Sequence, residues 1–339
     1  MKKDPSHILI SRTDSIGDVV LTLPVAKFLK DRFPKVKISF LGTNYTRPVI
    51  DACIFVDEFV NMNDFLNQTI YSESSLPDCI IHVFPVVAIA KRAKKLKIPL
   101  RIGTANRVYH WTTCNELIKL SRKNSDLHEA QLNLKLLAPF GIELDVSCEE
   151  IEDSFGLEKI LLLQKEFTDL LNPKKYNLIL HPKSQGNGRE WPLENFISLI
   201  KSLDKERYSF FISGTEKERT ALQPLFDQVS DFVTDITGKM NLSQFIAFIN
   251  HCDGMIASGT GPLHIASALG KDAFGIYPPI RPVHPARWKP IGKRARVFVL
   301  GRECNDCKNN PSACLCMKNV KPVWVKTELD EIALNKFVR

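Results

Sequence analysis

The chain has 339 residues, of which 44% are hydrophobic and 25% charged, and its formal net charge is +8. This length exceeds what one ordinary hydrophobic core organises and indicates two domains. The composition is that of a soluble globular protein. The mild basic excess is not the profile of an obligate nucleic-acid binder, and it suits an anionic substrate or visits to an anionic membrane surface.

Neither a targeting segment nor a membrane span is expected. The charged start at 1–6 is followed by an apolar run at 7–10, which is shorter than the core of a signal peptide. No stretch approaches the roughly 18 apolar residues of a spanning helix. We therefore expect a cytoplasmic protein, peripheral at most on the inner membrane face. Five of the nine cysteines lie in apolar or helical stretches typical of small buried thiols in a reducing compartment: Cys53, Cys79, Cys114, Cys148 and Cys252.

The first half alternates short apolar runs with helical patterns. Strands are predicted at 7–11, 36–42, 77–85 and 101–103, and helices at 18–31, 86–97 and 128–140. Pro24 either kinks the first helix or places its start near Thr22. Strand and helix in alternation predict a parallel sheet with helices on both faces.

A charged segment at 143–175, with one apolar helical pattern at 157–171, marks the junction between domains. Beyond it, strands are predicted at 176–181, 208–213, 254–258 and 273–277, and helices at 193–202, 216–226, 242–251 and 262–269. The predicted fold class is α/β. It comprises one Rossmann-like domain at 1–165, a second at 166–325, and a C-terminal helix at 326–339 that packs back on the first domain.

The turn from Ser258 to Pro262 is the strongest candidate site. Gly259 and Gly261 let the backbone turn tightly, and Pro262 opens a helix. The first N–H groups of that helix, with the Thr260 hydroxyl, form a candidate anion site. A plain strand-to-helix turn has the same spacing, and the segment is neither a GxGxxG fingerprint nor a Walker A loop.

A second anion-binding candidate follows the first strand of the second domain, in the loop at 181–192. Lys183 and Arg189 carry the charge to neutralise a diphosphate, and Ser184 has a hydroxyl to donate. A solvated loop is the alternative. Two such loops in one domain favour anion binding more than either does alone.

A third candidate site lies at 11–18, where a strand ends in a glycine-bearing loop that includes Arg12. The loop places Asp18 at a helix start. On the residues alone, Asp18 fits a helix-capping or first-turn acid as well as a catalytic base.

Five segments, in order along most of the chain, make the sequence resemble glycosyltransferase family 9, the ADP-heptose:lipopolysaccharide heptosyltransferases. They are Ser15-Ile16-Gly17-Asp18 continued to Pro24, His128-Glu129 with 134–137, Arg189-Glu190-Trp191-Pro192 with Phe196, the stretch 259–270, and Cys316-Met317-Lys318-Asn319-Val320. The matches are specific for the family and less specific for the sugar.

The resemblance implies a GT-B fold, in which two Rossmann-like domains face each other across a cleft. The first takes the acceptor and the second the nucleotide sugar. It further implies an inverting, metal-independent transfer that needs no cofactor. The favoured donor is ADP-heptose, and the acceptor is a lipopolysaccharide core or related surface glycan. One alternative keeps the fold with another nucleotide sugar and acceptor, and another is a non-catalytic nucleotide- or glycan-binding protein.

The resemblance also assigns residues. Asp18 takes the place of the general base that deprotonates the acceptor hydroxyl. The residues expected on the donor are Lys183, Ser184, Arg189, Glu216, Ser258, Gly259, Thr260, Gly261 and His264, with Glu218 as the alternative to Glu216 on the ribose. Those expected on the acceptor are Arg12, Arg281 and His284. A rigid proline-rich surface loop is the alternative for 277–288. At Gly259 the chain departs from many family members, which carry an acidic residue or asparagine there.

Two further features are open to interpretation. Cys304, Cys307, Cys314 and Cys316 have the chemistry of a structural zinc site, although the CxC spacing equally suits thiols or a local disulfide. The basic helical run at 91–97 has five cations to meet phosphorylated glycolipid head groups or an anionic membrane, and a solvated helix face is its alternative.

Overall fold

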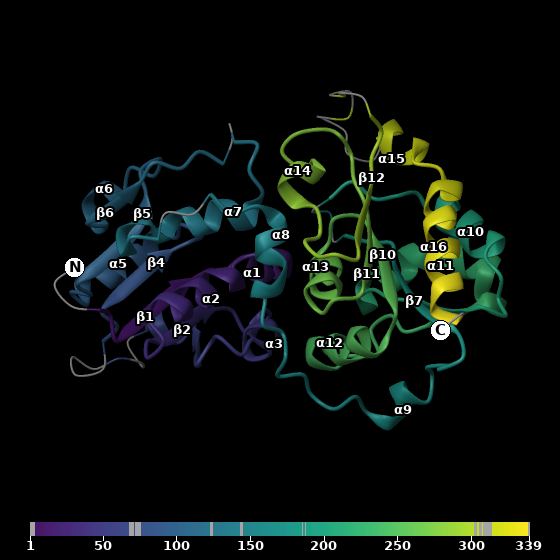
Figure 1. Ribbon diagram of the computed structural model, residues 1–339, viewed down its shortest axis with the longest axis horizontal. Coiled ribbons are helices and arrows are strands. Elements are labelled where there is room, and N and C mark those ends of the chain that lie inside the picture. The colour runs from purple at the N-terminus through teal and green to yellow at the C-terminus, as the bar shows by residue number, and fades with distance from the viewer. Residues whose placement is uncertain are drawn as a thin grey trace. The chain divides into compact units, whose positions relative to one another are not determined.

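The computed structural model describes residues 4–67, 71, 76–122, 125–142, 145–184, 186, 188–301, 304, 307 and 314–337. The chain forms two compact units, Met1–Lys159 and Ile160–Arg339 (Figure 1). Each unit is built on one parallel six-stranded sheet.

In unit 1 the strand order is β3-β2-β1-β4-β5-β6. Its strands are β1 (His7–Ser11), β2 (Lys37–Gly42), β3 (Glu58–Asn61), β4 (Cys79–His82), β5 (Leu100–Thr104) and β6 (Glu116–Ile118). Its helices are α1 (Ile16–Val20), α2 (Leu23–Arg32), α3 (Arg47–Asp51), α4 (Met62–Leu66), α5 (Val87–Lys95), α6 (His110–Thr113), α7 (Glu129–Leu134) and α8 (Cys148–Ile151).

In unit 2 the order is β12-β11-β10-β7-β8-β9. Its strands are β7 (Tyr176–His181), β8 (Tyr208–Ile212), β9 (Val233–Asp235), β10 (Gly254–Ala257), β11 (Asp272–Ile276) and β12 (Ala295–Phe298). Its helices are α9 (Lys165–Thr168), α10 (Leu193–Ser202), α11 (Arg219–Val229), α12 (Leu242–His251), α13 (Gly261–Ala268), α14 (Pro285–Trp288), α15 (Leu315–Asn319) and α16 (Pro322–Phe337).

Both sheets have the doubly wound order, which reverses direction between two central strands. In unit 1 the reversal lies between β1 and β4, where Ser11 is in register with His82. In unit 2 it lies between β7 and β10, where His181 is in register with Ala257. The loops that follow these strands begin at the carboxyl-terminal ends of the parallel strands, which is where ligands of such folds bind. The predicted pair of doubly wound α/β domains is confirmed.

The helix predicted at 18–31 forms as two helices. Thr22 is the N-cap of α2, and Pro24 lies in its first turn, where a missing N–H costs nothing. The segment 128–140 is α7 followed by a 3-10 helix that contains Pro139. Gly141, at φ +71°, ends it in the left-handed conformation that glycine tolerates.

The junction between the units differs from the sequence expectation in detail. Of the helix predicted at 157–171, α9 alone is helical. Leu161 and Leu162 are 59% and 93% exposed, so their spacing does not mark a buried helix face. The backbone of Lys159 donates to Ala52 of unit 1, whereas that of Gln164 donates to Gln244 of unit 2. The chain therefore changes units near 160 and not at 165.

The C-terminal helix also differs from its predicted place. It begins at Pro322, and it packs on α10. Val325, Leu329 and Ala333 belong to the core of unit 2, where 326–339 was expected to pack on the first domain. Over the described residues, no helix combines the length and apolar character needed to cross a membrane.

Candidate functional site

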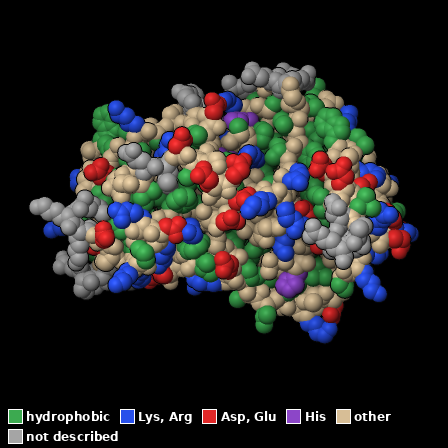
Figure 2. Space-filling model, in the orientation of Figure 1, with side chains coloured by type: hydrophobic (Ala, Val, Ile, Leu, Met, Phe, Trp, Pro, Cys, Tyr) green, Lys and Arg blue, Asp and Glu red, His purple; other side chains and the backbone are tan. Residues whose placement is uncertain are grey.

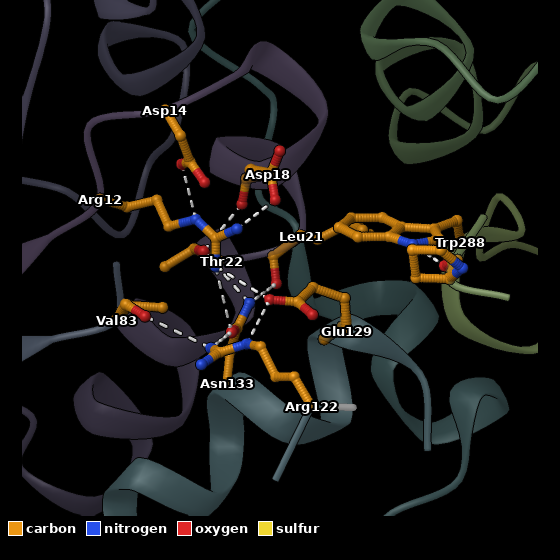
Figure 3. A network of polar contacts seen from close by, with 12 residues as sticks. Arg12, Asp14, Asp18, Leu21, Thr22, Val83, Arg122, Glu129, Asn133 and Trp288 are labelled. Carbon is orange, nitrogen blue, oxygen red and sulfur yellow. Dashed lines mark hydrogen bonds and ion pairs between the residues drawn. The ribbon is translucent and has the colours of Figure 1, made fainter. Parts of the chain in front are cut away.

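A buried network of charges surrounds Asp18 at the start of α1 (Figure 3). The Arg12 guanidinium, which is 3% exposed, donates to Asp18, to Asp14 at 2.7 Å and to Glu129 at 3.0 Å. Burial alone would lower the pKa of Arg12, but these carboxylates outweigh it and raise the pKa. Arg12 was expected to bind the acceptor; its observed contacts fit a residue that positions Asp18.

The environment of Asp18 favours a base that titrates near neutrality. Burial raises the pKa of its carboxyl to about 6, because charge is costly where water is excluded. The guanidinium of Arg12 lowers the pKa, and the carboxylates of Asp14 and Glu129 raise it. The side chain of Asp18 is 17% exposed, so it is held but reachable. A carboxyl with these properties is matched to general-base work.

The network continues into two residues of α7, Glu129 and Asn133, for which no role was predicted from the residues. Glu129 is buried and also accepts from Arg122 at 2.9 Å. Asn133, one turn later on the same helix face, accepts from Arg122 at 3.0 Å and donates to Thr22 at 3.2 Å. The signal that could have revealed this pair is an acid and an amide four residues apart on an otherwise apolar helix face.

The two anion-binding candidates of unit 2 lie against each other. The backbone N–H of Trp191, from the loop after β7, donates to the Ser258 hydroxyl at 3.0 Å. A Cβ on Gly188 would lie 3.5 Å from the Ser258 carbonyl oxygen. The structure thus brings together two loops separated by about 70 residues in sequence, as the parallel register of β7 and β10 requires.

The N-terminus of α13 has the geometry of an anion site. Thr260 is its N-cap, and the first intrahelical bond runs from the N–H of Leu263 to the Thr260 carbonyl. The Thr260 hydroxyl is buried, and no described group forms a hydrogen bond with it. A buried polar atom of this kind is costly unless a ligand or water satisfies it. Helix N–H groups and a hydroxyl together suit a phosphate.

Glu190 holds two residues of the loop after β7, Lys183 and Ser184, in place. Its carboxylate accepts from the Lys183 ammonium, and from both the N–H and hydroxyl of Ser184 at 2.8 and 3.0 Å. An ammonium has three donors, so one bond to Glu190 leaves capacity for an anion. Lys183 and Ser184 are therefore fixed at the sheet edge beside Ser258.

Comparison with known proteins decides the family. The model of glycosyltransferase family 9 (heptosyltransferase) matches residues 84–318. The chain belongs to glycosyltransferase family 9. A Haemophilus influenzae relative, whose name gives only the class glycosyltransferase, is 27% identical over 84% of this chain and 86% of its own. Lipooligosaccharide heptosyltransferase 2 of the same organism is 19% identical over 87% and 88%.

Solved structures of family 9 share the fold. A family 9 protein from Veillonella parvula superimposes with a TM-score of 0.75, at 18% identity, over 99% of both chains. The ADP-heptose heptosyltransferase II of Escherichia coli gives 0.72, at 18% identity, over 97% of this chain and 99% of that one. The resemblance and the GT-B fold class are confirmed, and the chain is a glycosyltransferase.

The glycine at position 259 has a physical cause in this chain. The residue has φ +51°, which strains any side chain. A Cβ there would lie 2.7 Å from a ring carbon of Tyr277. The Tyr277 hydroxyl donates to the Trp288 carbonyl at 2.6 Å, which fixes the ring in place. Tyr277 therefore leaves no room for a side chain at position 259.

The structure distinguishes the two ribose candidates. Glu218 closes a capping box, in which its carboxylate accepts from the N–H and hydroxyl of Thr215 at 2.8 and 2.9 Å. Glu216 is exposed, and its carboxylate lies over Gly238, where a Cβ would come within 2.3 Å. Glu218 is thus occupied by helix capping, which favours Glu216 as the residue that meets a ligand.

The zinc prediction is not supported. All four cysteine sulfurs lie in described residues, and among those residues no group of three or more His, Cys, Asp and Glu side chains is placed to hold a metal. Cys307, Cys314 and Cys316 are buried thiols of the unit 2 core. Arg189 donates to the Cys307 sulfur at 3.4 Å and to its carbonyl at 3.1 Å.

Three other predicted residues are placed as follows. His264 is buried in the first turn of α13. His284 is 9% exposed and is the N-cap of α14, whereas Arg281 is exposed and precedes a cis bond to Pro282. His264 therefore adjoins the anion site through its helix, and the loop of Arg281 and His284 belongs to unit 2.

Proposed function

We propose that this protein is an inverting, metal-independent glycosyltransferase whose favoured donor is ADP-heptose. Its acceptor is a lipopolysaccharide core or related surface glycan, and it works in the cytoplasm at the inner face of the inner membrane. The observation that carries the proposal is the partly buried carboxylate of Asp18, which Arg12 holds and whose pKa burial raises to about 6. A protein that merely binds nucleotide or glycan has no need of such a base.

In the proposed mechanism Asp18 takes the proton from the acceptor hydroxyl as its oxygen attacks the anomeric carbon. The bond to the donor diphosphate breaks in the same displacement, which inverts the anomeric configuration. Charge that develops on the leaving phosphate is met by Lys183, Arg189, the Thr260 hydroxyl and the N–H groups that open α13. Glu216 binds the ribose. The similar solved structures support heptose, because one heptosyltransferase of Escherichia coli has been solved both with ADP and with a fluorinated ADP-heptose.

Nucleotide binding tests the proposal. At a hundredfold excess over its Kd, ADP or ADP-heptose is expected to stabilise the protein by about 2.7 kcal/mol, roughly 5–10 °C for a unit of this size. Thr260→Val should reduce that shift, since it removes the buried hydroxyl at constant shape, whereas the exposed Thr220→Val should not. A larger shift with GDP- or UDP-sugars would favour the alternative donor. No shift with any of the nucleotides would contradict the proposal.

The rate is expected to depend on pH through Asp18. The base must be ionised, and burial has raised its pKa to about 6, so the active form is lost as pH falls through 6. Below that value kcat/KM should fall about tenfold per pH unit. Initial rates measured from about pH 4.5 to 8 at constant ionic strength provide the test. A rate that stays constant between pH 5 and 7 is incompatible with this assignment.

A further inference from the structure

Positive charge is concentrated in one region of unit 1. Between Cys79 and Ser125 the sequence holds ten lysines and arginines and a single acidic residue, Glu116. That excess is larger than the formal charge of +8 on the whole chain. The region folds as α5, β5, α6 and β6, of which β5 and β6 end the sheet on one side. Within this region, helix α5 carries exposed lysines at 91, 94 and 95.

The same region exposes large apolar side chains. Val108 is 81% exposed and Trp111 is 67% exposed. The indole N–H of Trp111 donates to the Ala105 carbonyl at 2.8 Å, which holds the ring in its exposed position. Val87, at the start of α5, is 42% exposed. Exposed aromatic and branched apolar side chains that gather in one region are typical of a surface that binds a membrane or another protein.

The charged and apolar groups lie on neighbouring elements of unit 1. Helix α5 packs on α6, which contains Trp111. One side of α5 is buried through Ile89, Ala90 and Ala93, which turns Lys91, Lys94 and Lys95 to solvent. Figure 2 shows hydrophobic side chains beside Lys and Arg at its upper left, over the part of unit 1 that Figure 1 labels α6 and β6.

We propose that this α5–α6 face docks on an anionic phospholipid bilayer. Val108 and Trp111 enter the boundary between head groups and acyl chains, and Lys91, Lys94 and Lys95 meet lipid phosphates. Basic and apolar contacts together give stable peripheral binding where either alone is weak. The inference rests on the proposed function in one respect, since it explains how the enzyme reaches a glycolipid acceptor. Its test, however, needs no sugar donor.

Vesicle co-sedimentation of the full chain tests the charged half. Binding to phosphatidylcholine vesicles with about a quarter phosphatidylglycerol is expected to be at least about tenfold stronger than to pure phosphatidylcholine, and to weaken at high salt. Reversing Lys91, Lys94 and Lys95 to Glu should weaken it at least about 30-fold. The control reverses exposed Lys174, Lys201 and Lys205 of unit 2, which alters net charge equally and should change binding less than about twofold.

A second pair of variants tests the apolar half. Val108→Ser with Trp111→Ala should weaken binding about tenfold, and Val108→Ser alone should weaken it measurably without touching the fold. The control, Val323→Ser with Trp324→Ala on α16, removes a similarly exposed pair and should have no effect. Equal binding to neutral vesicles, or full binding by either α5–α6 variant, overturns the proposal. All these variants should keep the nucleotide-induced stabilisation of the parent protein. Absence of that stabilisation in the parent protein would contradict the proposed function and not the membrane proposal.

Discussion

Asp18→Asn is expected to reduce the rate of sugar transfer by at least about 1000-fold while leaving nucleotide binding unchanged. Asparagine keeps the shape of the carboxylate but cannot accept the acceptor's proton, and a general base contributes about 10²–10⁴-fold. Nucleotide Kd should stay within about twofold, because the phosphate-binding loops belong to unit 2. Steady-state kinetics and calorimetric titration of the same preparation measure the two effects.

Asp14→Asn is the matched control for this substitution. Asp14 also accepts from Arg12, at 2.7 Å, so its loss perturbs the same guanidinium without removing the proposed base. Its rate should fall by less than about tenfold. An Asp18→Asn enzyme with a tenth or more of normal activity, or an Asp14→Asn enzyme that is equally inactive, would contradict the assignment of Asp18.

Glu129→Gln is expected to have the largest effect on stability. Glu129 lies between Arg12 and Arg122, at 3.0 and 2.9 Å, with 1% of its side chain exposed. Removal of its charge leaves the buried Arg12 and the partly buried Arg122 with less compensation, which costs about 3 kcal/mol or more. For a unit of this size the melting temperature should fall roughly 6–12 °C. The exposed Glu166→Gln serves as the control and should change it by less than about 2 °C.

The same variant has a consequence for catalysis that a structural role alone does not predict. The Glu129 carboxylate raises the pKa of Asp18, so its neutralisation should lower that pKa and move the acid limb of the rate profile below pH 6. Differential scanning calorimetry and a pH–rate profile of Glu129→Gln test both effects. An unchanged melting temperature would contradict the stabilising role of Glu129. An acid limb that stays in place or moves to higher pH would contradict its effect on the pKa of Asp18.

The doubly wound fold was predictable because its central strands are continuous apolar runs. Tyr176–His181 is buried at every position, so its pattern is unmistakable. Edge strands such as β6 and β9 have three residues each, half-buried or exposed, and lack such a signal. The apolar pattern at 157–171 wrongly predicted one helix, because Leu161 and Leu162 are exposed and do not form a buried helix face.

The candidate site was predictable wherever its chemistry is local in sequence. The turn at 258–262 carries glycines and hydroxyls, the loop at 181–192 carries glycines and cations, and strand order then brings the two together. The ion pairs around Asp18 were not predictable, because Arg12 and Glu129 are 117 residues apart and their contact depends on how α7 packs against α2. The need for glycine at position 259 was not predictable either, because it comes from the ring of Tyr277, which would clash with a side chain there.

The most direct test of the proposed reaction is the formation of a glycosylated product in the presence of a metal chelator. The protein would be incubated with ADP-heptose and a heptose-deficient lipopolysaccharide core, and the product would be analysed by mass spectrometry and by NMR of its new anomeric centre. The account predicts one added heptose of inverted configuration, with EDTA present and with Asp18→Asn inactive. Transfer that stops when EDTA is added, transfer with retained configuration, or full transfer by the Asp18→Asn enzyme would contradict it.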